Sequence, residues 1–369
     1  MLATFPHLGP VSYVMSAFFN ELKIPYVIPP GNDTCALKAG VEISPEEMCM
    51  PFKYMAGNLK RAYDMGADTA VMTATCGPCR LGEYCQLLME VMENAGCRYR
   101  WVFLDSPADI GSREFARRFS VLTEDSGVSG AKVMKTVTEG LAAVFKMDKL
   151  RNRLEWNAGF LENPYEAVDL MHETQKRLSE AETFGDCRCI IKEMSARLDG
   201  LKRKNNPAPV KILVTGEIYT SIDPAASGRL TEKLMMMGCS VRRHMSLSWW
   251  IRHTAAEMIV PEIIYDMFDV RGGIPCNIGG YGRQTVSGIL RSSDYDGIIK
   301  IMPSGCMPEI VAKAFCEKDT RSSRVRMLHL VYDELSGSAG YQTRTEAFVD
   351  MLERRKNVLA GDRYRLDQY

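Results

Sequence analysis

The chain has 369 residues, of which 46% are apolar and 25% charged, an ordinary composition for a globular protein long enough for two domains. Lysine plus arginine and aspartate plus glutamate each number 46, so the charge balance does not point to binding of nucleic acid or of an anionic membrane. The pattern predicts neither a secretory signal nor a membrane-spanning helix, and we expect a cytoplasmic protein.

The first third of the chain predicts strands that alternate with helices. Apolar runs predict strands at 1–5, 25–31, 67–74 and 97–105, and helical periodicity predicts helices at 9–24, 51–66 and 81–96. This alternation is typical of a parallel sheet with helices on its faces.

The middle of the chain is helical and charged, and the second half then restarts the plan of the first. The pattern predicts long helices at 166–184 and 189–204, a linker at 202–209, a helix at 225–238, and strands at 210–216, 239–245 and 295–306. The strand at 239–245 is expected to be exposed. We predict an α/β protein with two Rossmann-like lobes containing parallel sheets, residues 1–126 and 207–369, joined by a helical segment, residues 127–206.

The chain contains twelve cysteines, and in the cytoplasm, which keeps thiols reduced, disulfide bonds would not explain so many. Three of them lie in or beside apolar segments and are expected to be buried without a ligand role: Cys97, Cys239 and Cys316. Another three share the pattern Cys-x-Pro: Cys49-Met50-Pro51, Cys76-Gly77-Pro78 and Cys306-Met307-Pro308. Because proline favours the first turn of a helix, each of these cysteines is predicted just before a helix N-terminus, where the dipole favours thiolate.

Thiolates are the ligands that zinc and iron–sulfur clusters use. Structural zinc sites usually contain two close pairs of cysteines, whereas only Cys76 and Cys79 form a close pair here. Scattered cysteines suit an iron–sulfur cluster held in the cleft between two lobes. The sequence Cys76-Gly-Pro-Cys79 also occurs in thioredoxin-like proteins, but it lies deep in a repeating α/β pattern, and we interpret this match as coincidence.

Five blocks follow one another along nearly the whole chain: SPEEMCMPFKYMAGNLKRAYDMGADTAVM, GPCRLGEY, VTGEIYTSIDP, SGCMPEIVAKAF and YDELSGSAGYQTRTEAFVDML. Together they resemble the iron–sulfur family related to 2-hydroxyacyl-CoA dehydratases and to the activases of these enzymes. The resemblance implies two Rossmann-like lobes with a [4Fe–4S] cluster between them, held by three cysteines, with one iron left for substrate. Carried over to this chain, Cys49 and Cys306 are ligands, with Cys76 or Cys79 as the third.

The sequence contains no Walker A loop and no dinucleotide-binding fingerprint, so we expect no directly bound nucleotide. The resemblance also implies a small-molecule substrate, and it leaves open whether a related second subunit or a homodimer completes the site. The electron donor would be a separate ATP-hydrolysing activase that carries its own [4Fe–4S] cluster. The chain would then act as an ATP-dependent reductase or as a dehydratase-like lyase. Two alternatives stay open: a non-catalytic electron-transfer or assembly subunit, and a structural zinc protein.

Two cysteines, Cys35 and Cys76, depart from close relatives of the family, which often lack cysteine at these positions. One relative of the dehydratases carries a double-cubane [8Fe–9S] cluster held by six thiolates, and that type of cluster serves ATP-driven reduction of small molecules. Six cysteines of this chain would supply such a set: Cys35, Cys49, Cys76, Cys79, Cys276 and Cys306.

Four charged residues near these turns are candidates for the chemistry: Lys53, Arg80, Glu217 and Glu309. Lys53 and Arg80 would offset cluster charge or hold an anionic substrate, and a solvated helix face is an equal alternative for both. Glu217 follows a buried strand and suits acid–base work or substrate contact. Glu309 is expected to cap its helix, with proton transfer as the less favoured role. Ion pairs between segments are predicted for four residues near the C-terminus: Asp333, Glu334, Arg344 and Glu346.

Overall fold

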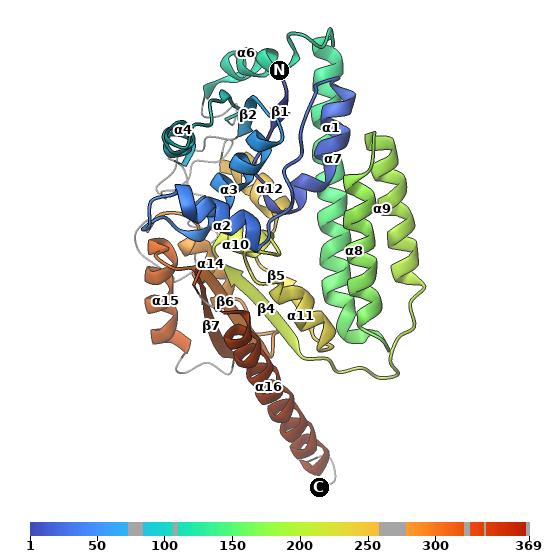
Figure 1. Ribbon diagram of the computed structural model, residues 1–369. Coiled ribbons are helices and arrows are strands. Elements are labelled where there is room, and N and C mark those ends of the chain that lie inside the picture. Colours follow the sequence, from blue (N-terminus) through green and yellow to red (C-terminus); the bar gives the residue numbers. More distant parts are fainter. Residues whose placement is uncertain (73–83, 106–109, 258–277, 321–324, 336, 367–369) are drawn as a thin grey trace.

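The computed structural model describes residues 1–72, 84–105, 110–257, 278–320, 325–335 and 337–366. Within these residues the strands form two parallel sheets among many helices, which confirms the predicted α/β class. Figure 1 shows the first sheet near the N-terminus and the second sheet below it, next to the long C-terminal helix.

The first sheet contains three parallel strands in the order β1-β2-β3: β1 (Ala3–Thr4), β2 (Thr69–Met72) and β3 (Arg100–Phe103). The strand predicted at 25–31 is reduced to one parallel bridge between Tyr26 and Ala3. Prolines limit this segment, because each lacks the N–H that a longer ladder would need: Pro25, Pro29 and Pro30.

The second sheet contains four parallel strands in the order β5-β4-β6-β7: β4 (Lys211–Gly216), β5 (Ser240–Arg243), β6 (Gly297–Pro303) and β7 (Arg326–Tyr332). If the Tyr26 bridge is taken as a second strand, both halves place their first strand between their second and third. The two halves therefore share one strand order. In such sheets the chain reverses direction across the sheet between the first and third strands, and ligands bind outside the carboxyl ends there.

Helices connect the strands in both halves. The first half contains η1 (Gly9–Val14), α1 (Met15–Glu21), α2 (Thr34–Ile43), α3 (Met50–Asp64), α4 (Tyr84–Asn94) and α6 (Ser112–Thr123). The second half contains α10 (Ile218–Ile222), α11 (Leu230–Met236), α12 (Leu247–Glu257), α14 (Gly282–Leu290), α15 (Met307–Thr320) and α16 (Ser338–Leu366). The helix predicted at 9–24 is thus divided into η1 and α1, and α2 had not been predicted.

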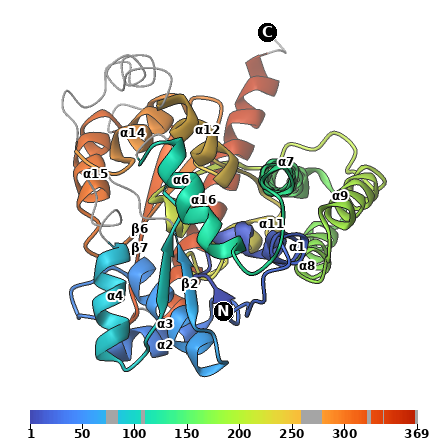
Figure 2. The ribbon, with the colours of Figure 1, turned by 90° about the horizontal axis from the view of Figure 1, so that it is seen from above.

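Three helices form a layer beside the sheets: α7 (Gly130–Asn157), α8 (Tyr165–Ser179) and α9 (Phe184–Asp199), with η3 (Ala158–Phe160) after α7. Figure 2 shows this layer, together with α1, on one side of the molecule. Side chains cap two of the helices: Ser129 accepts from Lys132 N, and Thr183 and Asp186 form a capping box. The helices predicted for the middle of the chain are therefore present.

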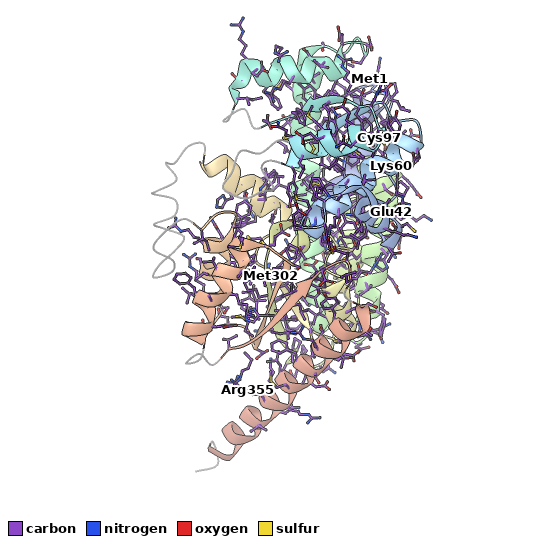
Figure 3. All side chains as sticks on the ribbon, turned by 60° about the vertical axis from the view of Figure 1, so that its left-hand side comes forward. Met1, Glu42, Lys60, Cys97, Met302 and Arg355 are labelled. Atoms are coloured by element: carbon purple, nitrogen blue, oxygen red, sulfur yellow. The ribbon has the colours of Figure 1, made fainter. Side chains whose placement is uncertain are left out.

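The predicted domain boundaries at 126 and 206 stay a prediction. One cluster of buried apolar side chains includes Ala70 of the first sheet as well as Ile212 and Ile299 of the second. Figure 3 shows packed side chains continuing from the region of Cys97 to that of Met302.

None of the described helices is long and apolar enough to cross a membrane.

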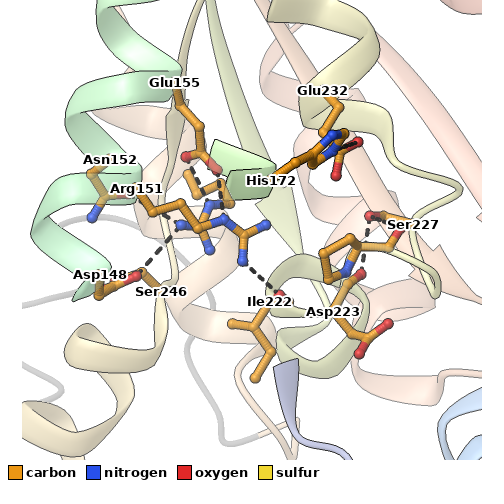
Figure 4. A network of polar contacts seen from close by, with 12 residues as sticks. Asp148, Arg151, Asn152, Glu155, His172, Ile222, Asp223, Ser227, Glu232 and Ser246 are labelled. Atoms are coloured by element: carbon orange, nitrogen blue, oxygen red, sulfur yellow. Dashed lines mark hydrogen bonds and ion pairs between the residues drawn. The ribbon is translucent and has the colours of Figure 1, made fainter. Parts of the chain in front are cut away.

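A buried network of charges fastens the helical layer to the second sheet (Figure 4). Arg243 donates from Nε to Glu155 at 2.9 Å and from Nη2 to Asp148 at 3.4 Å, and all three side chains are fully buried. Arg151 donates to Glu155 at 3.0 Å and to the Ile222 carbonyl oxygen at 3.0 Å. Because β5 packs on α7 through Arg243, the expectation of an exposed strand at 239–245 is wrong.

This network predicts a pH dependence of stability. Burial alone would raise the pKa of Asp148, but Arg243 and hydrogen bonds from Ser246 and Ser248 outweigh it and hold that pKa below 3.8. The stabilisation is therefore present above the unfolded-state pKa and is lost as the pH falls through the folded-state value. In urea unfolding, we expect the parent to have a higher free energy of unfolding than Asp148→Asn, and this difference to become smaller from about pH 7 to about pH 3. A constant gap would contradict this assignment.

Helices α2 and α3 approach each other closely at two glycines. A Cβ on Gly40 would lie 1.7 Å from the Lys53 carbonyl oxygen, and one on Gly57 would lie 1.9 Å from the Ala36 carbonyl oxygen. Neither position has room for a side chain. This contact fixes the two helices, and so the predicted ligands at their N-terminal ends, relative to each other.

Gly57→Ala is expected to lower the free energy of unfolding by about 1–3 kcal/mol, because the added methyl group forces α2 and α3 apart. Gly31→Ala is the matched control, since nothing lies within 4 Å of its Cβ position. Its effect should stay within about 0.5 kcal/mol in the same denaturation experiment. Equal effects of the two substitutions would show that the helix contact is not tight.

Candidate functional site

The carboxyl ends of the two sheets meet where the segment after β1 contacts α10, directly after β4. The Tyr219 hydroxyl donates to the His7 carbonyl oxygen at 3.3 Å. Gly9, at φ +54°, lies so close that a Cβ there would be 2.8 Å from the Ile222 carbonyl oxygen. We call this region the junction. It is the edge at which parallel sheets bind ligands.

A chain of hydrogen bonds crosses the junction. Asn32 donates to Asp223 at 2.8 Å and to the Tyr219 hydroxyl at 3.0 Å. On the other side, the backbone N–H of His7 donates to the Asn58 side chain of α3 at 3.0 Å. Burial raises the pKa of Asp223 and lowers the pKa of His7. These residues were not predicted, although several directly follow the predicted strands.

Cys49 caps the N-terminus of α3, as the Cys-x-Pro pattern predicted. Its backbone is extended, and Pro51 lies in the first turn of the helix. The thiol is partly buried and contacts the hydroxyl of Tyr84 at the start of α4. Helix dipole and phenol both suit a sulfur that carries negative charge.

Cys306 lies in the second half of the chain, between β6 and α15. Its carbonyl oxygen accepts from Ile310 N at 2.9 Å, the first hydrogen bond of the helix. Gly305, at φ +75°, allows the chain to turn sharply from the strand into the helix. The Cys306 side chain is 9% exposed.

An ion pair joins the neighbourhoods of the two thiols. Lys53, one turn after Cys49, contacts the carboxylate of Glu334 and donates to the Glu46 carbonyl oxygen at 3.0 Å. Glu334 follows β7, whose last residue accepts from the backbone of Ser304, two positions before Cys306, at 2.7 Å. Lys53 is 2% exposed, so its alternative interpretation as part of a solvated helix face is wrong. The ion pair predicted for Glu334 is confirmed.

The two candidate glutamates, Glu217 and Glu309, lie near each other, and Glu309 is in the first turn of α15, after Cys306. Glu309 pairs with Lys300 of β6 at 2.6 Å and accepts from the Thr285 hydroxyl at 2.8 Å. Glu217 caps α10 by accepting from Tyr219 N and Thr220 N, each at 2.8 Å. Burial raises the pKa of Glu217, hydrogen bonds from its own turn oppose this, and the charge of Glu309 adds to it.

These contacts give both glutamates clear structural roles. Glu309 holds the first turn of α15 to β6, because Lys300 also donates to its backbone carbonyl oxygen at 2.9 Å. Acid–base or proton-transfer roles for Glu217 and Glu309 stay predictions.

The other predicted ligands divide into two groups. Cys35 lies exposed in the first turn of α2, after the N-cap Asp33. Four predicted site residues lie outside the described residues: Cys76, Cys79, Arg80 and Cys276. In the sequence, Cys76 and Cys79 follow β2, the third strand of the first half, just as Cys306 follows β6, the third strand of the second. The described part of the chain contains no group of three His, Cys, Asp or Glu residues arranged to hold a metal ion.

No protein-family model matches this chain, and no curated protein matches it in sequence. The comparisons therefore define no family for it.

Proposed function

We propose that this chain is an iron–sulfur protein that holds its cluster between the two halves of the chain and reduces a small molecule there. In this proposal Cys49 and Cys306 are ligands, and Cys76 or Cys79 supplies a third. Electrons would come from a separate ATP-hydrolysing activase with its own [4Fe–4S] cluster. The chemistry that the cluster would supply is transfer of single electrons at low potential.

One observation supports the proposal most strongly: the two Cys-x-Pro thiols that the structure describes lie one in each half of the chain, each directly before a helix. Cys49 is the N-cap of α3, Cys306 lies between the end of β6 and α15, and the Lys53–Glu334 ion pair links their surroundings. By residue type, and by their places before helix N-termini, these two thiols are suited to be thiolate ligands.

The surrounding residues have defined tasks in this proposal. Tyr84 directs its hydroxyl to the Cys49 sulfur and can donate a hydrogen bond to a thiolate there. Lys53 and Glu334 hold α3 against the second lobe. Lys300 and Glu309 hold the turn after Cys306, and their charges compensate each other inside the protein.

Purification without oxygen, followed by iron, sulfide and zinc analysis, tests the proposal. We expect a brown protein that bleaches in air and contains about 4 or about 8 iron atoms per chain, according to cluster type. Zinc without iron, even after reconstitution with iron and sulfide, would overturn the cluster and favour structural zinc. An electron-transfer subunit would differ from a reductase in having no iron open to an added ligand.

Cys35 and Cys76 distinguish the two cluster types. For a single [4Fe–4S] cluster held by Cys49, Cys79 and Cys306, the Cys35→Ser/Cys76→Ser double variant should keep its iron. For a double cubane, the double variant should lose about half of it. We predict the loss, because two further thiols at one sheet edge exceed what packing requires. An unchanged iron count would contradict the double cubane and leave the single cluster intact.

A further inference from the structure

Three aromatic rings form a cluster beside the Cys306-Met307-Pro308 turn. Trp249 and His253 of α12 have ring centroids 4.7 Å apart, and each lies 5.5 Å from the ring of Tyr281, which precedes α14. His253 is 2% exposed, whereas Trp249 and Tyr281 are half-buried. The cluster therefore combines a buried imidazole with two large rings that are each partly exposed.

A buried amide next to these rings has one polar end without a partner. Gln284 is 6% exposed, and its Nε2 lies 3.2 Å from His253 Nε2. Its Oε1 is buried and has no hydrogen-bond partner among the described residues. Leaving a buried acceptor unpaired costs about 1–3 kcal/mol, so this oxygen favours a ligand that brings an N–H or O–H donor.

This aromatic cluster lies close to Cys306. A Cβ on Gly282, the first residue of α14, would lie 2.7 Å from the Pro308 carbonyl oxygen in the Cys306-Met-Pro turn. One turn later, Thr285 donates to Glu309. Trp249 and Tyr281 also pack against the apolar cluster of Ile218, Ile222 and Met245, the first two of which belong to α10, just after β4. The rings thus border the carboxyl edge of the second sheet, next to a proposed cluster ligand.

We propose that Trp249, Tyr281 and Gln284 form the subsite for the small molecule that is reduced, and that this molecule contains a planar ring with an N–H group. The ring would stack on the aromatic surface, and its N–H would donate to Gln284 Oε1. This inference deepens the proposed function, since it assigns a substrate class to the same site. Binding itself does not depend on the presence of a cluster.

Calorimetric titration of the full-length protein, with and without iron, tests the subsite. Benzimidazole is the probe, and 1-methylbenzimidazole, which lacks the N–H group, is the matched compound. We expect benzimidazole to bind at one site about tenfold more tightly than its methylated form, the factor that corresponds to one hydrogen bond. No binding of benzimidazole, or equal affinity for the two compounds, would overturn the proposal.

Variants locate the binding site. Trp249→Leu should weaken benzimidazole binding at least about tenfold through loss of stacking, whereas Trp101→Leu, in the first sheet, should not change it. Gln284→Met should remove the preference for the N–H compound while binding persists. Unchanged binding in folded Trp249→Leu, checked by circular dichroism, would overturn the site. Iron-free protein that binds benzimidazole would support the subsite even if the cluster proposal failed.

Discussion

Cys49→Ser and Cys306→Ser are each expected to lose most of the iron from protein prepared without oxygen. A serine hydroxyl is a poor replacement for a thiolate ligand, and a cluster that loses one of a few ligands is released or degraded. Each substitution is small in volume and lies at a helix cap, where serine is well tolerated. The loss should therefore appear in the iron and sulfide content and in the absorption spectrum, with secondary structure retained.

The matched controls are two buried cysteines that we do not predict to be cluster ligands. Cys97 is 2% exposed and Cys239 is fully buried. Burial raises the pKa of both thiols, that of Cys239 to about 12, so both are protonated at neutral pH. Cys97→Ser and Cys239→Ser should keep their iron. If Cys97→Ser and Cys306→Ser lose iron to the same extent, the ligand assignment is wrong.

Arg243→Met is expected to destabilise the protein by about 3–5 kcal/mol, the largest stability effect that we predict for one side chain. The substitution leaves Asp148 and Glu155 buried, with Arg151 as the one remaining cation of the network. Removing one partner of a buried ion pair costs more than the pair contributes, because the remaining charge is not compensated.

Arg242→Met provides the control for this prediction. Arg242 is the preceding residue of β5, but its side chain is exposed and lies over the ring of Trp156 at 5.1 Å. We expect a loss of no more than about 1 kcal/mol, as for an exposed cation–π contact. Similar denaturation midpoints for the two variants would show that the buried network does not fasten the helical layer.

The sequence was informative where local pattern decides structure. Apolar runs and helical periodicity were enough for the parallel α/β plan, and the Cys-x-Pro pattern placed Cys49 and Cys306 before helices. Prediction failed where contacts between residues far apart in the chain determine which side chains are buried. β5 is buried because Arg243 reaches Asp148, which lies 95 residues away in the chain. Lys53 is buried because Glu334, 281 residues further on, meets it.

At the junction, too, some features could be predicted from local sequence and others could not. His7 and Asn32 could have been selected because each follows a predicted strand, the position at which parallel sheets bind ligands. Their pairing with Tyr219 and Asp223 depends on how the two halves pack, and no local pattern contains that information. The ring cluster was missed for a similar reason, since Tyr281 meets Trp249 only in the folded chain.

The central claim is that thiolates of both lobes, Cys49 and Cys306 among them, hold an iron–sulfur cluster. The most direct test is Mössbauer spectroscopy of protein prepared without oxygen and with isotopically enriched iron, for the parent and for Cys306→Ser. We predict that the parent spectrum shows iron in tetrahedral sulfur coordination, and that most of this signal is lost in the variant. Iron bound only to nitrogen and oxygen, or an identical cluster signal in Cys306→Ser, would contradict the account.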